Sequence, residues 1–364
     1  IRLGLFMFLI MIGYPVAFTF AGTATIFFLI GWAQGDLDPA QLNALFNKWF
    51  ADSASNFTFL AIPFFVFMGA IFEKSGLAER LLTTIGMLLG PLRGGMAVAV
   101  VIVGTLLAAA TGVVAATVIV MGVLSLPVMI RYGYDHQLAS GVIVASGTLA
   151  QLMPPSLVLI VLAQFIPVSV GQLFAGALIP GMLLATMFAA YVVMVAYSKP
   201  GSAPPIPRSE RTMSRGQMAK QFFLAVVPPL GLILAVLGSI FQGYATASEA
   251  GAVGALGALV LAAAYRRLTW KVLWQAARST SNITSLVLQI LLASTYFAIV
   301  FDRLGGQDRI TAWLESVPGG LWGFILASHI IVFLLGINLE FLEISFIVMP
   351  LFIPAAIALD VNLV

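Results

Sequence analysis

The sequence predicts an all-α membrane protein that crosses the lipid bilayer many times. Of its 364 residues, 61% are hydrophobic and only 9% are charged, whereas a soluble domain has about 25% charged residues. The mean hydropathy is +1.08. The apolar runs are continuous and lack the alternation with period two that is typical of a membrane β-barrel. Because no water-soluble fold hides this much apolar surface, the lipid bilayer is the first partner that we predict.

The composition also excludes several classes of function. The chain has no cysteine and only two histidines, His136 and His329, so we expect no disulfide, no transition-metal site and no cofactor. An enzyme is not predicted, because an obvious nucleophile or metal centre is missing. No phosphate-binding GxxxxGK[ST] loop occurs, which argues against an ATP-driven pump. The net charge of +3 does not indicate nucleic acid, because membrane proteins collect Lys and Arg in their cytoplasmic loops.

The apolar segments set the expected helices. A spanning helix needs about 20 apolar residues. Two of the runs are too long for one span and too rich in glycine and proline for one straight helix, so we predict re-entrant hairpins or broken helices in them. The segments are 3–33, 57–72, 95–128 (too long), 138–166 (too long), 171–198, 222–242, 244–265, 282–301, 321–337 and 344–359.

The polar stretches set the orientation and the predicted domains. Residues 199–220 carry five bases and one acid, Glu210, and have no apolar periodicity. We predict a cytoplasmic linker there, between a first membrane repeat at 1–198 and a second at 221–364. A basic cluster at 266–278 follows two spans later and agrees with this side, whereas the acidic loop 34–56 suits the outside.

The two halves share short motifs in the same order. GYPVA at 13–17 matches GYATA at 243–247, FEKSGLAERL at 72–81 matches FDRLGGQDRI at 301–310, and SLPVM at 125–129 matches FIPAA at 352–356. All three pairs lie about 230 residues apart, which indicates an internal repeat. An odd number of predicted crossings between them makes the repeats inverted. Chance similarity among apolar segments is the alternative.

The stretch GTLAQLMPPS at 147–156 breaks a helix within an apolar region. Pro154 and Pro155 have no backbone N–H, so carbonyls further back lose their helical donors. Ser146, Thr148 and Ser156 add hydroxyl oxygens. Carbonyls at broken helices bind Na⁺ in secondary transporters with inverted repeats. We therefore expect this break to supply ligands for an ion or a solute.

Each half also has a candidate hairpin tip. In 107–127 the tip falls at Thr111-Gly112 and is expected to aim at the proline break; simple packing of small residues is the alternative. In the second half the tip falls at 336–340. Asn338 and Glu340 would ligate a cation or carry a proton there, or Glu340 would cap a helix.

Two further acids have a simpler expected role at helix starts. For Glu343 we favour capping of a helix that begins at Ile344. Glu249 is expected in the first turn of a helix that Thr246 or Ser248 caps, with a direct role in binding as the less favoured alternative.

Taken together, these segments resemble the large membrane subunit (the M-type permease) of tripartite ATP-independent periplasmic (TRAP) transporters. The resemblance covers the whole chain and rests on GYPVAF, FEKSGLAERL, SLPVMIRYGYD and GTLAQLMPPS, then YATASEAGAVGALGALV and GINLEFLEISFIVMPLFIPAAIALDVN. It is similar to the branch for α-keto acids, mannitol and chloroaromatic acids. The chain departs from the family at 111–114, TGVV instead of SGSS, and at 246–249, TASE instead of TPTE. The first departure removes hydroxyls, so an ion there must depend more on carbonyls.

The resemblance implies an elevator-type importer of a small organic acid in the bacterial inner membrane, driven by a Na⁺ gradient. A small four-helix membrane subunit and a periplasmic solute-binding protein complete such a system. The implied Na⁺ ligands are Thr111, Gly112, Ser146, Gly147, Thr148, Pro155, Ser156, Asn338 and Glu340, and the implied solute contacts are Thr111, Val113, Pro154, Ser156 and Asn338.

Two expectations and one alternative remain from the sequence. A second proline-pair break is expected at about residue 381, by the repeat offset, so we expect the chain to be incomplete at its C-terminus. The short outer loops predict that high affinity for the solute comes from the binding protein. The alternative is a stand-alone elevator transporter for organic anions that needs no binding protein; a channel or an intramembrane enzyme fits less well.

Overall fold

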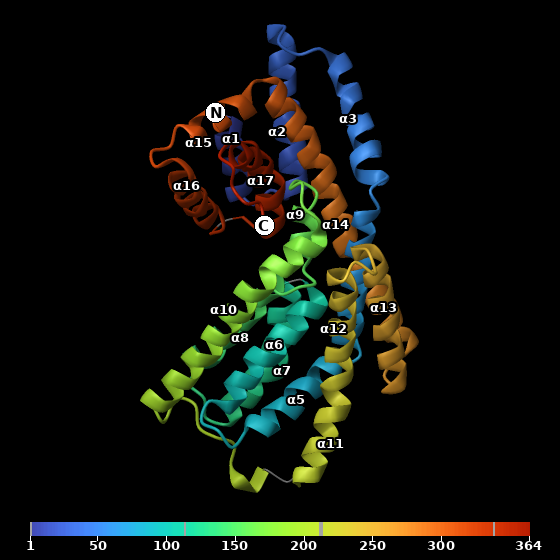
Figure 1. The fold of residues 1–364 in the computed structure, drawn as a ribbon, viewed down its shortest axis with the longest axis vertical. Coiled ribbons are helices and arrows are strands. Elements are labelled where there is room, and N and C mark those ends of the chain that lie inside the picture. Colours follow the sequence, from blue (N-terminus) through green and yellow to red (C-terminus); the bar gives the residue numbers. More distant parts are fainter. Residues whose placement is uncertain (1, 113, 211–213, 338) are drawn as a thin grey trace. The chain divides into compact units, whose positions relative to one another are not determined.

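The computed structural model describes residues 2–112, 114–210, 214–337 and 339–364, and helices are the only regular elements in these ranges. Within these ranges, seven helical segments are long and apolar enough to cross a bilayer. The chain packs as two compact units (Figure 1). Unit 1 comprises Ile1–Phe59, Val161–Val168 and Ile283–Val364, and unit 2 comprises Leu60–Ile160 and Ser169–Asn282. The predicted all-α polytopic membrane class is confirmed.

Unit 1 is built from helices at both ends of the chain. Phe6, Phe20 and Phe297 join three of these helices, with ring centroids 4.6 to 5.5 Å apart. Its elements are α1 (Arg2–Met11), α2 (Val16–Gln34), η1 (Pro39–Leu42), α3 (Asn43–Lys48), η2 (Trp49–Ala54), η3 (Phe57–Leu60), the later part of α14 (Trp270–Arg303), α15 (Gly306–Glu315), α16 (Gly320–Leu335) and α17 (Phe341–Ala358).

Unit 2 holds the central part of the chain. Its core is aliphatic and includes Val100, Leu107, Met121 and Ile143, all at most 5% exposed. The elements are α4 (Ala61–Lys74), α5 (Leu77–Leu89), α6 (Gly95–Thr111), α7 (Val114–Arg131), α8 (His136–Thr148), η4 (Leu149–Gln151), α9 (Leu157–Leu162, which continues into unit 1), α10 (Val170–Ser198), η5 (Arg208–Glu210), α11 (Arg215–Ala225), α12 (Val227–Phe241), α13 (Ala247–Ala264) and the start of α14.

Both overlong apolar segments are divided, as the sequence predicts. Residues 95–128 form α6 and α7 with a break at Gly112, and 138–166 form α8, η4 and α9 with a break at the proline pair. The tyrosine hydroxyl of Tyr134, just after α7, accepts a hydrogen bond from the backbone N–H of Met96 at the start of α6 (3.2 Å). The open ends of α6 and α7 therefore meet, and the two helices form a hairpin.

The predicted linker packs against the open end of this hairpin. Gly94 N–H donates to the Ala203 carbonyl (2.9 Å), Ile206 N–H to the Gly90 carbonyl (2.9 Å) and Asp135 N–H to the Ser202 carbonyl (2.8 Å). If the linker is cytoplasmic, as its charge predicts, the open end of the hairpin faces the same side. The division of the chain at this linker stays a prediction.

Salt-bridge and hydroxyl contacts hold the linker more firmly than its composition suggests. Arg131 forms an ion pair with Glu210 (3.1 Å), and the Tyr132 hydroxyl donates to the same carboxylate (3.0 Å). Burial and Glu210 raise the pKa of Tyr132, so its hydroxyl remains a donor at neutral pH. Helix α11 begins inside the predicted linker because Ser214 and Gln217 form a capping box.

Glycines in the left-handed conformation lie at matching positions in the two halves. Such glycines end or begin helices where a side chain would be strained. The matching pairs are Gly13 and Gly243, Gly76 and Gly305, and Gly94 and Gly319, with φ between 69° and 99°. Their order supports the predicted repeat, whereas the inversion of the two halves stays a prediction.

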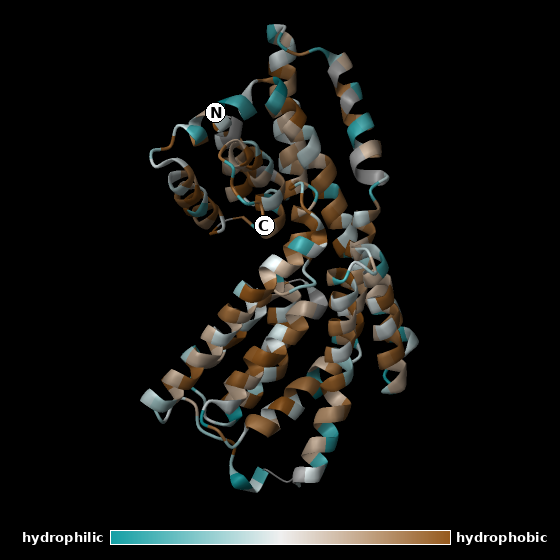
Figure 2. Cartoon of the chain, viewed as in Figure 1, coloured by the Kyte–Doolittle hydropathy of each residue, from teal (hydrophilic) through white to brown (hydrophobic). Residues whose placement is uncertain are grey.

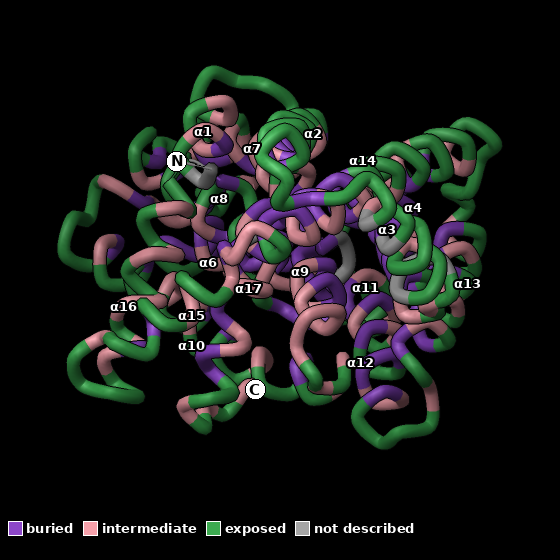
Figure 3. Tube along the Cα trace, turned by 90° about the horizontal axis from the view of Figure 1, so that it is seen from above, coloured by how far each residue is buried: buried purple, intermediate pink, exposed green. Residues whose placement is uncertain are grey.

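Apolar side chains cover much of the outer surface. Figure 2 shows hydrophobic residues along most helices, and Figure 3 shows many exposed positions on them. Ile179 is 77% exposed on α10, Phe333 is 74% exposed on α16, and Leu256 is 63% exposed on α13. A soluble protein rarely exposes so many large apolar side chains in contiguous patches, and lipid contact explains them.

Candidate functional site

The described part of the α6–α7 hairpin tip is Gly112, a glycine in the left-handed conformation. Gly112 follows the last residue of α6 with φ of 62°, and its N–H donates to the Ala108 carbonyl (3.0 Å). A left-handed conformation costs an L-residue with a side chain about 1–2 kcal/mol. Helix α6 ends here, so carbonyls in its last turn remain without helical donors.

The break after α8 is formed by a short 3₁₀ turn and the proline pair. Pro154 and Pro155 are joined by a cis peptide bond, and α9 begins at Leu157. Pro155 has no N–H to donate to the Gln151 carbonyl. The Ser156 hydroxyl takes that place and donates to the Gln151 carbonyl at 2.6 Å. Ser156 itself is fully buried.

The hairpin tip lies directly against this break. A Cβ atom added at Gly112 would lie 3.1 Å from the backbone N of Leu157 and 3.4 Å from the Leu157 Cβ. Both the backbone angle and the space therefore require glycine at this position. The prediction that the tip is aimed at the proline break is confirmed. We call Gly112 with Pro154, Pro155 and Ser156 the break site; all four residues are in unit 2 and carry no charge.

The other predicted ligands from α8 point in different directions. Ser146 is fully buried, and its hydroxyl donates to the Ile143 carbonyl (3.0 Å). A Cβ added at Gly147 would lie 2.2 Å from Val118 Cγ2, so Gly147 lets α8 approach α7 closely. Thr148 is exposed, and its hydroxyl donates to the Ala145 carbonyl (2.7 Å). The roles of these three residues as Na⁺ ligands stay predictions.

For three of the predicted ligand residues, the structure describes only the backbone or nothing. Thr111 is the last residue of α6, but its side chain lies outside what the structure describes. Val113 and Asn338 lie outside the described residues. Their predicted contacts with ion and solute stay predictions.

The acids of the second half lie at the start of α17 in unit 1. Glu343 is 7% exposed, and its carboxylate accepts a hydrogen bond from the backbone N–H of Glu340 (3.0 Å). The capping role of Glu343 is confirmed, but the predicted start at Ile344 is wrong: α17 begins at Phe341. Glu340 occupies the N-cap position and is exposed. Its predicted role in binding a cation stays a prediction.

Glu249 has the structural role that the sequence favours. It is the third residue of α13, and its carboxylate accepts from the Thr246 N–H (2.8 Å) and from the Thr246 hydroxyl (2.9 Å). The backbone N–H of Glu249 donates back to the Thr246 hydroxyl (3.3 Å). This is a complete capping box, so Thr246 is the cap that the sequence left open between Thr246 and Ser248.

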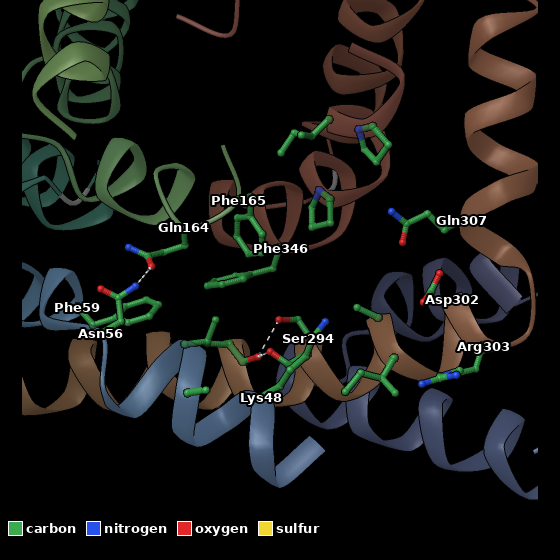
Figure 4. A pocket seen from close by; sticks show the side chains of 18 residues that line it. Lys48, Asn56, Phe59, Gln164, Phe165, Ser294, Asp302, Arg303, Gln307 and Phe346 are labelled. Atoms are coloured by element: carbon green, nitrogen blue, oxygen red, sulfur yellow. Dashed lines mark hydrogen bonds between the residues drawn. The ribbon is translucent and has the colours of Figure 1, made fainter. Parts of the chain in front are cut away.

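Unit 1 contains a cavity of about 810 Å³ that the sequence did not predict, which we call the outer cavity (Figure 4). Its wall carries two cations, one carboxylate, three amides and two hydroxyls between apolar side chains. These polar residues are Lys48, Arg303, Asp302, Asn56, Gln164, Gln307, Ser294 and Thr295. They come from α3, the segments after η2 and α9, α14 and the start of α15. The volume lies within the range of about 300–1,000 Å³ that is typical of ligand sites.

Neither cation of the outer cavity forms an ion pair within the part of the chain that the structure describes. The Asn56 amide donates to the Gln164 amide oxygen (2.6 Å), as Figure 4 shows, and so fixes one wall. One sequence signal was available: Lys48 is the single base in the acidic segment 34–56. Its proximity to Arg303, far along the chain, was not readable from the sequence.

Comparison with known proteins identifies similarity over nearly the whole chain. The family model "Tripartite ATP-independent periplasmic transporter, DctM component" matches residues 3–364. The C4-dicarboxylate TRAP transporter large permease protein DctM of Pseudomonas aeruginosa is 30% identical over 89% of this chain and 74% of that protein. DctM of Rhodobacter capsulatus is 29% identical over 99% of this chain and 82% of that protein. The sialic acid TRAP transporter permease protein SiaT of Haemophilus influenzae is 26% identical, covering 100% of this chain and 57% of that protein.

Proposed function

Because the chain belongs to the DctM family of TRAP transporter large permeases, we propose that it imports a small organic anion across the membrane, driven by a Na⁺ gradient. It is a multi-pass protein of the bacterial inner membrane, and the relatives that it matches are named as transporter permeases. The single observation that carries the proposal is the contact between the hairpin tip at Gly112 and the proline break at Leu157.

The break site is proposed to hold the coupling Na⁺. Hard cations prefer oxygen ligands, and unwound backbone carbonyls coordinate Na⁺ in other secondary transporters. The Ser156 hydroxyl uses its proton toward the Gln151 carbonyl, so its oxygen lone pairs remain for a cation. Pro154 supplies no N–H to the Ala150 carbonyl, which adds a second candidate ligand. No other cofactor is proposed.

Neutral ligands favour Na⁺ over a proton as the coupling ion. A proton relay needs titratable groups, and the break site has none among its residues. Glu340, in unit 1, is the one titratable residue in the predicted ligand set. We propose that Glu340 contributes to a second cation site together with Asn338.

The outer cavity is proposed to receive the organic anion. The named relatives carry C4-dicarboxylate and sialic acid, both organic acids, which supports an anionic solute for this chain. Lys48 and Arg303 provide positive charge without a competing ion pair among the described residues, and amides from Asn56, Gln164 and Gln307 provide neutral hydrogen bonds. Arginine and amides together recognise carboxylates well. The identity of the acid, including an α-keto acid, belongs to this proposal.

The partners and the mechanism follow from the family. We propose a small four-helix membrane subunit and a periplasmic solute-binding protein as partners; membership of a tripartite periplasmic transporter family supports two further components. Movement is proposed to be of the elevator type. Because the outer cavity is open and only modestly charged, the binding protein is expected to provide the high affinity at micromolar solute.

The test is reconstitution of the membrane subunits in vesicles with an inward Na⁺ gradient, with and without the binding protein, at micromolar concentration of a candidate organic acid. We expect uptake only when both the Na⁺ gradient and the binding protein are present. Equal uptake without the binding protein would exclude the tripartite mechanism and favour the stand-alone organic-anion transporter.

A further inference from the structure

Unit 2 contains a second polar cavity, of about 580 Å³, that has no role in the transport function proposed above. Three guanidinium groups line it, from Arg80 on α5 and from Arg266 and Arg267 after α13. The one carboxylate in its wall is Glu79, and Thr83 adds a hydroxyl. We call it the arginine pocket.

The arginines of this pocket are not neutralised, and one of them, Arg80, is held in place by an aromatic ring. The Arg80 guanidinium lies 5.2 Å from the centre of the Tyr265 ring, a cation–π contact. The Tyr265 hydroxyl donates to the Leu224 carbonyl, which joins the end of α13 to α11. Among the described residues none of the three arginines forms an ion pair. The wall therefore carries a net positive charge that calls for an anion.

The backbone at this corner is a C-terminal helix cap that fixes where Arg266 and Arg267 leave α13. Arg266 has φ of 56°, a left-handed conformation that usually belongs to glycine at a helix end. Its N–H donates to the Ala263 carbonyl and that of Arg267 to the Ala262 carbonyl, both at 2.8 Å. Cations near the C-terminus of any helix are stabilised by the helix dipole. That effect does not explain why Arg80, from another helix, lines the same cavity.

The neighbouring side chains place the pocket at the level of the lipid headgroups. Trp270 is 76% exposed and Trp274 is 62% exposed, both in the first turns of α14. Phe223 and Leu224 on α11 are 65% and 53% exposed. Exposed tryptophans are typical of the membrane–water interface. The basic clusters predict that this end of unit 2 faces the cytoplasm.

We propose that the arginine pocket binds the phosphate group of an anionic phospholipid of the inner leaflet. Arginine pairs with phosphate oxygens through two parallel hydrogen bonds, and basic pockets on the cytoplasmic side of membrane proteins bind anionic headgroups. The exposed Phe223 and Leu224 would contact the acyl chains. The proposal goes beyond transport and does not depend on the identity of the solute or of the coupling ion.

The test is lipid titration of the whole purified chain in a neutral detergent, followed by native mass spectrometry with phosphatidylglycerol, phosphatidylcholine or inorganic phosphate. The pocket variant is R266Q/R267Q, which leaves the contact of Arg80 with Tyr265 intact. The matched control is K271Q/R278Q, which removes two exposed charges of the same basic cluster that do not line the pocket. Size-exclusion profiles and melting temperatures verify that both variants fold.

We expect the wild-type chain to prefer phosphatidylglycerol to phosphatidylcholine. The pocket variant should lose affinity for phosphatidylglycerol by about 10- to 30-fold, and the control by less than about threefold. Equal losses in both variants would mean general surface charge and would overturn the proposal, as would unchanged affinity in the pocket variant. Binding of inorganic phosphate with no preference for the lipid would also overturn it. A separate R80Q variant should show a loss in the same direction.

Discussion

The break site and the outer cavity are lined by groups of opposite chemical character. The break site is buried and neutral: a left-handed glycine, two prolines and the Ser156 hydroxyl, which donates to a carbonyl freed by proline. The outer cavity is open and charged, with Lys48 and Arg303 and three amides. A small cation needs only oxygen dipoles, whereas an organic anion needs opposite charge. In this proposal the Na⁺ at the break site and the solute in the outer cavity are held by separate groups of residues, in unit 2 and unit 1 respectively.

The largest expected effect comes from closing the break. The double variant P154A/P155A restores two N–H groups, so α8 can continue and the freed carbonyls regain helical donors. Na⁺-driven uptake should fall to background while membrane insertion persists. The control is P180A, which removes an exposed proline inside the continuous helix α10 and should change uptake by less than about twofold. Unchanged uptake in P154A/P155A would mean that the prolines only kink the helix and do not form an ion site.

The next effect comes from the hairpin tip. G112A places a Cβ against Leu157 and forces a left-handed alanine, a cost of about 1–2 kcal/mol. We expect uptake to fall by about tenfold, with a lower melting temperature. Gly141 in α8 is the matched control, because a Cβ there meets nothing within 4 Å. If G112A and G141A behave alike in uptake assays, the tip has no special role.

Removing the positive charges of the outer cavity should raise the KM for the solute and leave the Na⁺ dependence of uptake unchanged. K48Q and R303Q should each raise the KM for the organic anion by about 5- to 10-fold, since each removes a charge-assisted hydrogen bond. The Na⁺ concentration for half-maximal uptake should stay the same. R309Q, an exposed base on α15 outside the cavity wall, is the control. A shift in Na⁺ dependence instead of KM would contradict the separation of the two sites.

The smallest effect is expected from removal of the Ser156 hydroxyl. S156A removes the donor to the Gln151 carbonyl and one candidate Na⁺ ligand. The Na⁺ concentration for half-maximal uptake should rise by about 3- to 10-fold, with the KM for the solute unchanged. S140A, which removes an exposed hydroxyl bonded to the His136 carbonyl in the same helix, should leave both values unchanged.

The sequence predicted those features that local chemistry decides. A proline pair in the interior of a helical segment breaks the helix, glycine ends helices, and capping boxes start them. The break, the tip and the roles of Glu249 and Glu343 were therefore predictable. Successive helical residues point about 100° apart. Ser146, Gly147 and Thr148 therefore cannot share one face, and the structure shows them buried, packed against α7 and exposed, respectively.

Features that depend on distant contacts were not predictable. The outer cavity combines Lys48, Gln164 and Arg303, which are far apart in the chain. Residues 199–210 look like a solvated linker by composition, yet Ala203 and Ile206 are 0% and 2% exposed. Their backbones bond to Gly94 at the start of α6 and to Gly90 at the end of α5. Only tertiary packing reveals these contacts.

The central claim is that neutral oxygens at the break site hold Na⁺ as the coupling ion. The most direct measurement is uptake of the organic anion into vesicles that contain the membrane subunits and the binding protein, with either a Na⁺ gradient or a pH gradient alone. The account predicts uptake with the Na⁺ gradient at constant pH, and none with the pH gradient in Na⁺-free buffer. Uptake driven by the pH gradient without Na⁺ would contradict the account and would make Glu340 the candidate proton carrier.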